Sequence, residues 1–264
     1  MRDDAPSVTA RGVAVARSQL DRPQSPTGDP DAETRLARTL IEGLATESRA
    51  DVADFLGYVA TRTRFFDDAV LHALDDRIRQ VVILGAGYDG RALRFRTPGV
   101  RFFEVDHPAT QADKRHRLAT VGASTENITF VAADFTEPGL AETLASAGHD
   151  RDARSLFICE GVLRYLPEHW FRELLRAAAE SAAARSALAA SISTSASDRE
   201  GDGRGDRARQ RRLEELGEPV LTVPDRDTAM QWLTGAGWTL QSVDEVSETT
   251  PGSRPGRLLV RAVR

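Results

Sequence analysis

Apolar residues recur at helical spacing through the first part of the chain, up to residue 76. The segments with this spacing are VTARGVAVARSQL (8–20), ETRLARTLIEGLA (33–45) and DVADFLGYVATRTRFFDDAVLHALDD (51–76). Because such spacing gives a helix one apolar face, it predicts three helices. Pro23, Gly28 and Pro30 lie between the first two segments and predict a turn-rich connection. We therefore expect a helical region ahead of the first strand.

A different pattern starts at residue 80, where short runs of β-branched and aliphatic residues alternate with helix-length segments. The runs are QVVIL (80–84), VRFFEVD (100–106), NITFVAAD (127–134), SLFICEG (155–161) and SALAASIS (186–193). Continuous apolar runs of this length are typical of parallel strands that are buried on both faces. Five strand–helix units in series predict a doubly wound, Rossmann-like α/β sheet.

The last third of the chain is more varied. STSASDREGDGRGDRAR (193–209) is polar and glycine-rich, which predicts a surface loop that leads into a helix at RARQRRLEELG (207–217). DTAMQWLTGAGW (227–238) then predicts a helix, and TLQSVDEVSE (239–248) and RLLVRAVR (257–264) predict strands. Because the connection between these two strands is short and turn-rich, we expect them to pair antiparallel.

The composition fits a globular protein that binds a small molecule. The 264 residues are 41% apolar and 28% charged, with a net charge of -5. No apolar run approaches the roughly twenty residues that span a bilayer, and the acidic balance offers no general attraction for nucleic acid or an anionic membrane. Neither the single cysteine, Cys159, nor any histidine has metal-ligand spacing. We expect a cytoplasmic protein with a small-molecule substrate and no metal, nucleic acid or membrane partner. The sequence leaves its oligomeric state open.

The glycine-rich segment after the first strand points to a nucleotide-like ligand. Gly85, Gly87 and Gly90 satisfy the G-x-G-x-x-G pattern, in which a tight turn brings the backbone close to a bound cofactor. Glu104 and Asp106 end the next strand, where a carboxylate can accept hydrogen bonds from both hydroxyls of a ribose. A nicotinamide dinucleotide and S-adenosyl-L-methionine both satisfy this pattern.

Three features favour S-adenosyl-L-methionine. The glycine segment follows a long helical region, and the sheet continues to residue 264 without a separate substrate domain. Asp134 ends the third strand, where its carboxylate could accept a hydrogen bond from the amine of adenine. The glycine segment holds no Arg or Lys, and Asp89 within it would repel a pyrophosphate but attract a cationic cofactor. An NAD-dependent oxidoreductase and a non-catalytic cofactor-binding protein are the alternatives.

Three co-linear motifs resemble one family. QVVILGAGYDGRALRF (80–95), RFFEVDHPATQADKRHRL (101–118) and LFICEGVLRYLPEHWFRELLR (156–176) are similar to the leucine carboxyl methyltransferase-like family of class I S-adenosylmethionine-dependent methyltransferases, which includes bacterial polyketide-tailoring O-methyltransferases. The resemblance implies a seven-stranded sheet with a terminal antiparallel hairpin. It also implies an N-terminal helical cap (1–80) that forms one structural unit with a catalytic domain (81–264). The implied activity is O-methylation of a small molecule, often a carboxylate.

The resemblance also assigns a cofactor site. Its residues are Arg62 for the cofactor carboxylate, Gly85, Ala86 and Gly87 in the glycine loop, Asp106 or Glu104 for the ribose, Asp134 and Phe135 beside the adenine, and Glu160 facing the amino-acid part. Arg64 is close enough to Arg62 to leave that choice open. Asp106 is favoured over Glu104 because it lies further toward the carboxyl end of its strand. Many relatives have threonine where this chain has Gly90, so we expect a looser loop.

The sequence shows no convincing general base, so the catalytic residues stay unassigned. His107 precedes Pro108 at an expected helix start, where capping or packing is its ordinary role. Tyr165 lies in EGVLRYL, where it either lines a substrate pocket or belongs to the core. A carboxylate acceptor is already ionised at neutral pH and needs no base, whereas a phenol or an alcohol would benefit from one. The sequence therefore favours a carboxylate acceptor.

Overall fold

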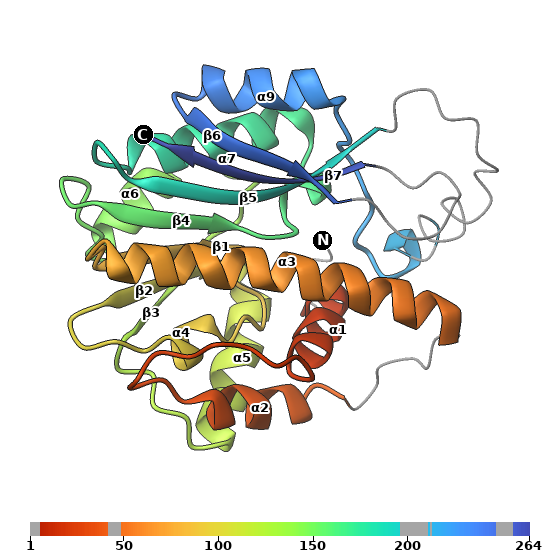
Figure 1. The fold of residues 1–264 in the computed structure, drawn as a ribbon, viewed down its shortest axis with the longest axis vertical. Helices are drawn as coiled ribbons and strands as arrows, with labels where there is room; N and C mark the ends of the chain where they lie inside the picture. Colours follow the sequence, from red (N-terminus) through yellow and green to blue (C-terminus); the bar gives the residue numbers. More distant parts are fainter. Residues whose placement is uncertain (1–5, 42–48, 196–210, 212, 247–255) are drawn as a thin grey trace.

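Seven strands form one mixed sheet in the computed structural model, which describes residues 6–41, 49–195, 211, 213–246 and 256–264 (Figure 1). Their order across the sheet is β3-β2-β1-β4-β5-β7-β6. In chain order the strands are β1 (Gln80–Leu84), β2 (Arg101–Asp106), β3 (Ile128–Ala132), β4 (Ser155–Cys159), β5 (Ala187–Thr194), β6 (Thr239–Glu245) and β7 (Gly256–Val263). The five predicted parallel strands and the antiparallel pair near the C-terminus are confirmed.

The pairing of the strands creates a switch point between β1 and β4. Strands β1 to β5 are parallel to one another, and β7 lies between β5 and β6 and is antiparallel to both. From β1 the chain builds the sheet outward through β2 and β3, then returns to place β4 on the other side of β1. In doubly wound sheets the ligand binds at such a point, beyond the carboxyl ends of the strands.

Most predicted helices are present. The helices are α1 (Val8–Arg17), α2 (Pro30–Arg38), α3 (Arg49–Asp75), α4 (Arg91–Arg94), α5 (Pro108–Thr120), α6 (Leu140–Ser146), the 3-10 helix η1 (Leu163–Tyr165), α7 (Glu168–Glu180) and α9 (Arg226–Gly235). The helix predicted at 33–45 instead spans Pro30–Arg38, and residues 42–45 lie outside the described residues. Most of the predicted surface loop, residues 196–209, also lies outside them, as do residues 249–255 of the predicted turn.

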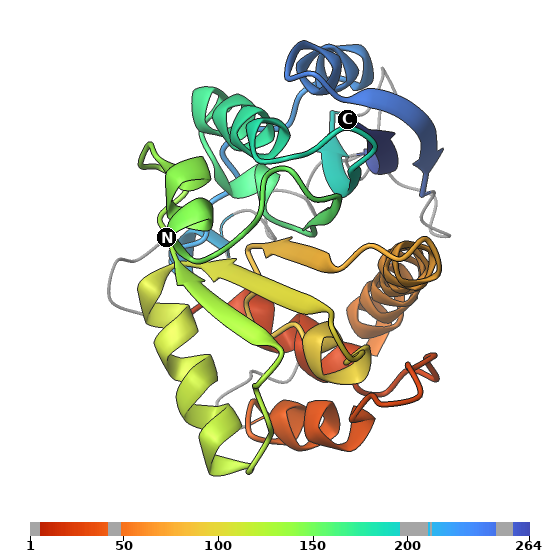
Figure 2. The ribbon, with the colours of Figure 1, turned by 90° about the vertical axis from the view of Figure 1, so that its left-hand side faces the viewer.

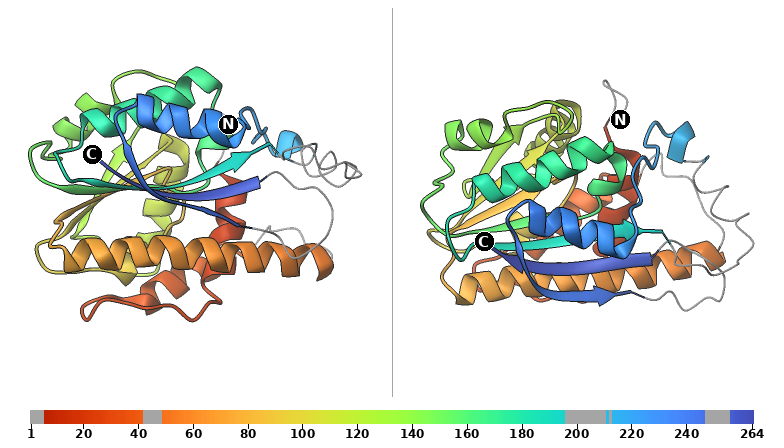
Figure 3. Two further views of the ribbon diagram at one scale, coloured as in Figure 1. Left: turned by 45° about the horizontal axis from the view of Figure 1, so that its top comes forward. Right: turned by 90° about the horizontal axis from the view of Figure 1, so that it is seen from above.

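The two faces of the sheet are covered by different helices, as Figure 3 shows for α3 on one side and α7 and α9 on the other. Val81 and Ile83 of β1 pack with α3 and α4, whereas Val82 and Leu84 belong to the cluster that includes α6, α7 and α9. This alternation explains why the strand is apolar throughout, because each face has its own core. No helix among the described residues has both the length and the apolar character that crossing a membrane requires.

The first three helices do not form one separate layer. Phe66 and Val70 of α3 are fully buried against the sheet, so α3 belongs to the sheet's own covering layer. Leu36 of α2 and Leu118 of α5 share a smaller apolar cluster, and Figure 2 shows the two helices close together. Helix α1 instead lies near the end of the sheet to which the β4 arrow points (Figure 1). The division into a cap at 1–80 and a catalytic domain at 81–264 stays a prediction.

Candidate cofactor and substrate site

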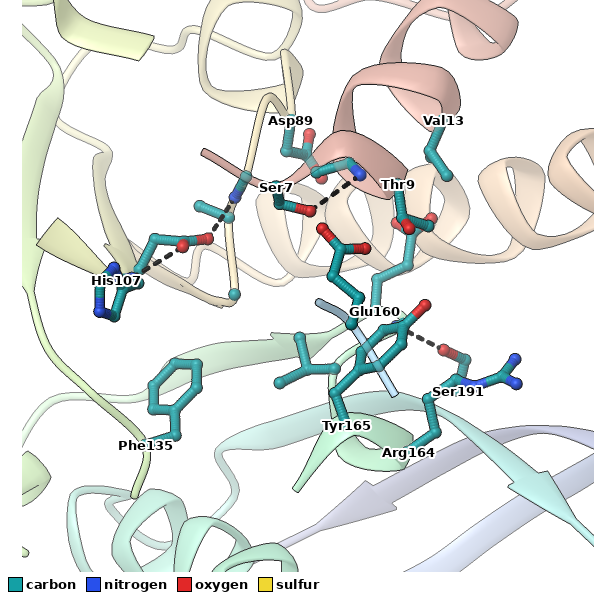
Figure 4. A pocket seen from close by; sticks show the side chains of 18 of the residues that line it. Ser7, Thr9, Val13, Asp89, His107, Phe135, Glu160, Arg164, Tyr165 and Ser191 are labelled. Atoms are coloured by element: carbon teal, nitrogen blue, oxygen red, sulfur yellow. Dashed lines mark hydrogen bonds between the residues drawn. The ribbon is translucent and has the colours of Figure 1, made fainter. Parts of the chain in front are cut away.

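A cavity of about 290 Å³ lies beyond the carboxyl ends of the parallel strands. Its walls come from the segments that follow β1, β2, β3 and β4, from the carboxyl-terminal half of β5, from α1 and α3, and from residues 218–219. Figure 4 shows side chains from these separate parts of the chain around one space. The cavity is therefore at the switch point, where this kind of sheet binds its ligands.

The glycine loop after β1 is folded tightly against its neighbours. Gly85 has φ +68°, and a Cβ atom there would lie 2.1 Å from Val162 Cγ2. The N–H groups of Gly85 and Ala86 both donate to Val105 O, at 2.8 and 3.0 Å. The Gly87 N–H donates to Asp106 Oδ2 at 2.5 Å. Glycine at position 85 is thus required by both backbone conformation and space.

Asp106 is the acidic residue of β2 that lines the cavity. Besides the bond from Gly87, its Oδ1 accepts the His107 N–H at 2.7 Å. Burial raises the pKa of Asp106, and the two backbone N–H groups oppose that rise. Each carboxylate oxygen can still accept a second hydrogen bond from a ligand.

Glu104, the second ribose candidate, is not among the residues that line the cavity. Its Oε2 lies 2.5 Å from Lys114 Nζ, and both side chains are 2% exposed. Burial raises the pKa of Glu104 to about 6, although the neighbouring Lys114 lowers it. The structure therefore places Asp106 at the cavity and Glu104 in a buried ion pair.

Asp134 and Phe135, the two residues expected beside the adenine, line the cavity beyond β3. Asp134 Oδ1 accepts the N–H of Thr136 at 2.8 Å and its hydroxyl at 2.7 Å. Burial acts to raise the pKa of Asp134, but these two hydrogen bonds hold it below its usual value. In Figure 4, Phe135 lies on the same side of the cavity as His107. This side therefore offers an aromatic ring and a carboxylate together.

Arg62, not Arg64, lines the cavity. Arg62 is 8% exposed, and its Nε donates to Glu160 Oε1 at 2.8 Å. Burial acts to lower the pKa of Arg62, but the charge of Glu160 raises it above its usual value. Arg64 is exposed on the other side of α3. A Cβ atom at Gly161 would lie 3.4 Å from Arg62 Nη1, so this nitrogen lies close to the loop after β4.

Glu160 accepts hydrogen bonds from three arginines. Besides Arg62, Arg17 Nη2 reaches its Oε1 at 2.7 Å and Arg91 Nη1 reaches its Oε2 at 2.6 Å. Burial alone would raise the pKa of Glu160, but the charges of Arg17, Arg91 and Arg62 hold it well below its usual value. Counting the described residues, Oε1 has two donors and Oε2 has one, so Oε2 keeps an acceptor position for a ligand.

These residues belong to a larger buried network of charges. It consists of Arg17, Arg22, Arg62, Arg91 and Arg94 with Glu33, Asp67, Asp89 and Glu160. Within the part of the chain that the structure describes, these five cations and four anions leave one positive charge in excess. A buried charge is costly unless it is paired and hydrogen-bonded, so the network favours an additional anion beside it.

Two expectations about the glycine loop are corrected. Asp89 does not present a free negative charge, because it pairs with Arg91 at 2.5 Å and with Arg17 at 3.3 Å. Gly90 does not leave the loop with empty space, since a Cβ atom there would lie 2.3 Å from Glu33 Cγ. Glycine at position 90 makes room for Glu33 of α2 and its ion pairs.

Sequence reasoning missed the contribution of α1 and of the segment before α9. Ser7, Thr9, Val13 and Arg17 line the cavity from α1 and its N-cap, and Glu218 lines it from the chain between β5 and α9. Arg17 belongs to the helix predicted at 8–20, but it lies outside the three motifs on which the family resemblance rests. Tyr165 does line the cavity, and Figure 4 labels it among the side chains around that space.

Known structures show the same fold. A duf574 family protein from Streptomyces avermitilis superposes with a TM-score of 0.61 at 16% identity, covering 98% of each chain. Magnesium protoporphyrin IX methyltransferase from Synechocystis, crystallised with S-adenosylhomocysteine, gives a TM-score of 0.54 at 15% identity, covering 89% of this chain and 93% of its own. The fold is that of the class I S-adenosylmethionine-dependent methyltransferases.

Sequence relatives define the family. The model of the leucine carboxyl methyltransferase family matches residues 15–179. A Mycobacterium bovis protein with the provisional name S-adenosyl-L-methionine-dependent methyltransferase is 32% identical over 261 residues, covering 91% of this chain and 82% of the relative. A Streptomyces coelicolor protein with the same provisional name is 43% identical over 129 residues, covering 48% of this chain and 45% of the relative. The chain belongs to the leucine carboxyl methyltransferase family and uses S-adenosyl-L-methionine as its cofactor.

Proposed function

We propose that the chain transfers the methyl group to an oxygen of a small-molecule acceptor, a carboxylate of a polyketide or another secondary metabolite. The observation that carries this proposal concerns His107, which lines the cavity. Its Nδ1 accepts the Ala109 N–H at 3.3 Å, at the start of α5. A neutral ring in this arrangement carries its proton on Nε2, where it donates and cannot remove a proton. An acceptor that is already ionised suits the cavity better than an alcohol or a phenol.

The carboxylates and the aromatic ring beyond β2 and β3 suit the nucleoside part of the cofactor. Asp106 keeps an acceptor position on each oxygen, which matches two neighbouring ribose hydroxyls. Asp134 uses Oδ1 for Thr136, so Oδ2 is the oxygen we assign to the adenine amine. We assign Phe135 to the adenine ring, since aromatic rings pack in offset or edge-on arrangements. The tight turn at Gly85–Gly87 keeps Cβ atoms out of the space beside the cofactor.

The buried charge network suits the amino-acid part of the cofactor. Its excess positive charge favours a carboxylate, and we assign that carboxylate to Arg62, which lines the cavity. Glu160 holds the Arg62 guanidinium through Nε and so fixes its plane. The remaining acceptor position on Glu160 Oε2 suits the ammonium group of the same amino-acid part. We extend the site to Arg17, which closes it from α1.

The protein contributes mainly position and a dry environment to methyl transfer. S-adenosylmethionine, when bound, supplies an electrophilic methyl group on a sulfonium. Helix α1 and the segment around Glu218 cover the cavity, and this cover keeps water away from an acceptor carboxylate. A carboxylate that has lost its water shell reacts more readily with a cation, because the two charges cancel as the bond forms. Oriented binding supplies a further part of the rate.

A product analysis tests this proposal. The protein is incubated with S-adenosylmethionine that carries an isotopically labelled methyl group and with a library of small carboxylic acids, phenols and amines, and products are found by mass spectrometry. We expect labelled methyl esters, which mild alkali hydrolyses to labelled methanol. Label that resists alkali, in an ether or an amine, contradicts the carboxylate acceptor. Tight binding of S-adenosylhomocysteine with no labelled product from any acceptor class contradicts the enzymatic role.

A further inference from the structure

Glu218 is a buried carboxylate that the proposed cofactor site does not use. It lies between the helical residues 213–215 and α9, is 6% exposed, and lines the cavity. Its own N–H donates to Leu213 O at 2.8 Å. The N–H of Leu221 and that of Thr222 both donate to Arg164 O of η1, at 2.8 and 3.2 Å. The segment that carries Glu218 is therefore fixed to the loop that follows β4.

Among the described residues, one of the two carboxylate oxygens of Glu218 has a hydrogen-bond partner and the other has none. Oε1 accepts the Val8 N–H at 2.9 Å, at the first residue of α1. Oε2 is buried, and no described residue donates to it. The positive end of α1 favours a carboxylate at this place, which explains the hydrogen bond that Oε1 accepts. It does not explain why Oε2 is buried without a donor. Such a buried oxygen costs free energy unless a ligand or a water molecule donates a hydrogen bond to it.

The position of Glu218 makes the methyl acceptor, and not the cofactor, its expected ligand. Arg17 and Val8 are the last and first residues of α1, so along the helix axis they are roughly 13 Å apart at 1.5 Å per residue. Arg17 lies at the proposed amino-acid pocket beside Glu160, and Val8 lies at Glu218. The ribose, adenine and amino-acid groups of the cofactor already have proposed partners elsewhere in the cavity.

We propose that Glu218 Oε2 binds the methyl acceptor, by accepting a hydrogen bond from a hydroxyl or an ammonium group close to the carboxylate that is methylated. This inference rests on the proposed function. It narrows the substrate class to small hydroxy acids or amino acids. The same carboxylate repels an acceptor that places a second negative charge there, so Glu218 also excludes diacids of similar shape.

Glu218→Gln separates this role from the support of α1. The glutamine oxygen can still accept the Val8 N–H, while an amide NH2 group replaces the free carboxylate oxygen in the cavity. The matched control is Asp225→Asn, because Asp225 is the N-cap of α9, accepts the Thr228 N–H at 2.8 Å, and does not line the cavity. Both variants should keep the thermal stability and the S-adenosylhomocysteine affinity of the parent.

The decisive measurement uses acceptors that differ at one group. The probes are 3-phenylpropanoate, 3-phenyllactate and phenylalanine, together with octanoate, 2-hydroxyoctanoate and 2-aminooctanoate. Ester formation from labelled S-adenosylmethionine gives kcat/KM for each. In the parent, the hydroxy or the amino acid of a set should exceed the unsubstituted acid by about tenfold or more, the usual effect of a hydrogen bond to a charged group. Whether the hydroxy or the amino acid is preferred identifies the donor.

The outcomes separate this inference from the function on which it rests. Glu218→Gln should bring the ratio within each set close to one, whereas Asp225→Asn should leave the ratio unchanged. Equal methylation of all members by the parent, or a full ratio in Glu218→Gln, overturns the role of Glu218 and leaves the carboxyl methyltransferase proposal standing. A loss of S-adenosylhomocysteine affinity in Glu218→Gln also overturns it, by placing Glu218 at the cofactor. Ester formation from none of the six acids contradicts the proposed function itself.

Discussion

Asp106 and Glu104 are two residues apart on β2 and have the same chemical group, but their surroundings differ. Asp106 lines the cavity, and Glu104 is paired with Lys114 in the interior.

Asp106→Ala should weaken S-adenosylhomocysteine binding by about 1 to 3 kcal/mol while the fold persists, because charge-assisted hydrogen bonds to the ribose are lost. Calorimetry measures the affinity, and circular dichroism checks the fold. Glu104→Gln is the control: it should lower the melting temperature and leave the affinity nearly unchanged. The reverse pattern would assign the ribose to Glu104.

Arg62 and Arg64 offer a second comparison at the scale of single residues. Arg62 is buried at the cavity, whereas Arg64 is exposed. Arg62→Lys keeps the charge but loses the planar donors that can hold a carboxylate with two hydrogen bonds. S-adenosylhomocysteine should therefore raise the melting temperature of Arg62→Lys much less than that of the parent. S-adenosylhomocysteine should raise the melting temperature of Arg64→Lys as much as that of the parent. If the rise is reduced in Arg64→Lys and not in Arg62→Lys, the cofactor carboxylate belongs to Arg64.

At the scale of elements, Glu160 links α1, α3 and α4 to the end of β4 through Arg17, Arg62 and Arg91. The folded protein holds the pKa of Glu160 below its usual value. The stabilisation from this carboxylate is therefore complete above the pKa of the unfolded chain, about 4.3, and is lost as the pH falls below it. Glu160→Gln should cost about 3 to 5 kcal/mol at pH 7, because it leaves buried arginines without their anion.

Urea unfolding at several pH values measures this effect. The difference in free energy of unfolding between parent and Glu160→Gln should narrow as the pH falls from 5 toward 3. Glu168→Gln is a suitable control, because Glu168 is 60% exposed and faces Arg172 at 3.6 Å on the same helix. An exposed pair of this kind contributes little at any pH. A difference for Glu160→Gln that does not change with pH would contradict the role of its charge.

The elements themselves could largely be predicted, because their signals are local. Strands β1 to β5 are apolar runs, and their parallel carboxyl ends bring Gly85, Asp106 and Asp134 to one cavity. The charge network could not be predicted, since it depends on pairs far apart in the chain: Arg17 and Glu160 are separated by 143 residues. Glu218 was missed for a similar reason, because its segment has no periodic pattern and reaches the cavity only through the folded chain.

At the scale of the whole molecule, the glycine loop and α1 together decide which cofactor the chain can bind. A dinucleotide needs free backbone N–H groups for its pyrophosphate. Here the N–H groups of Gly85 and Ala86 donate to Val105 O, and that of Gly87 donates to Asp106. The same loop packs against α1, since a Cβ atom at Gly87 would lie 2.9 Å from Ala10 Cβ. The N–H groups of Gly85, Ala86 and Gly87 are therefore already engaged and do not face a phosphate.

S-adenosylhomocysteine should therefore stabilise the whole protein, and NAD should not. A ligand at one hundred times its dissociation constant adds about 2.7 kcal/mol to the free energy of unfolding. For a chain of this size that corresponds to a rise of roughly 5 to 10 °C in the melting temperature.

Thermal unfolding with each compound at the same concentration makes the comparison. Adenosine serves as a control, because it has the nucleoside of the cofactor without the amino-acid part. Adenosine should give a smaller rise than S-adenosylhomocysteine, because it does not reach the arginine network. Equal rises with adenosine and S-adenosylhomocysteine would show that Arg62 and Arg17 hold no part of the cofactor. A rise with NAD would mean that the loop opens and frees its N–H groups, contrary to the closed arrangement with α1.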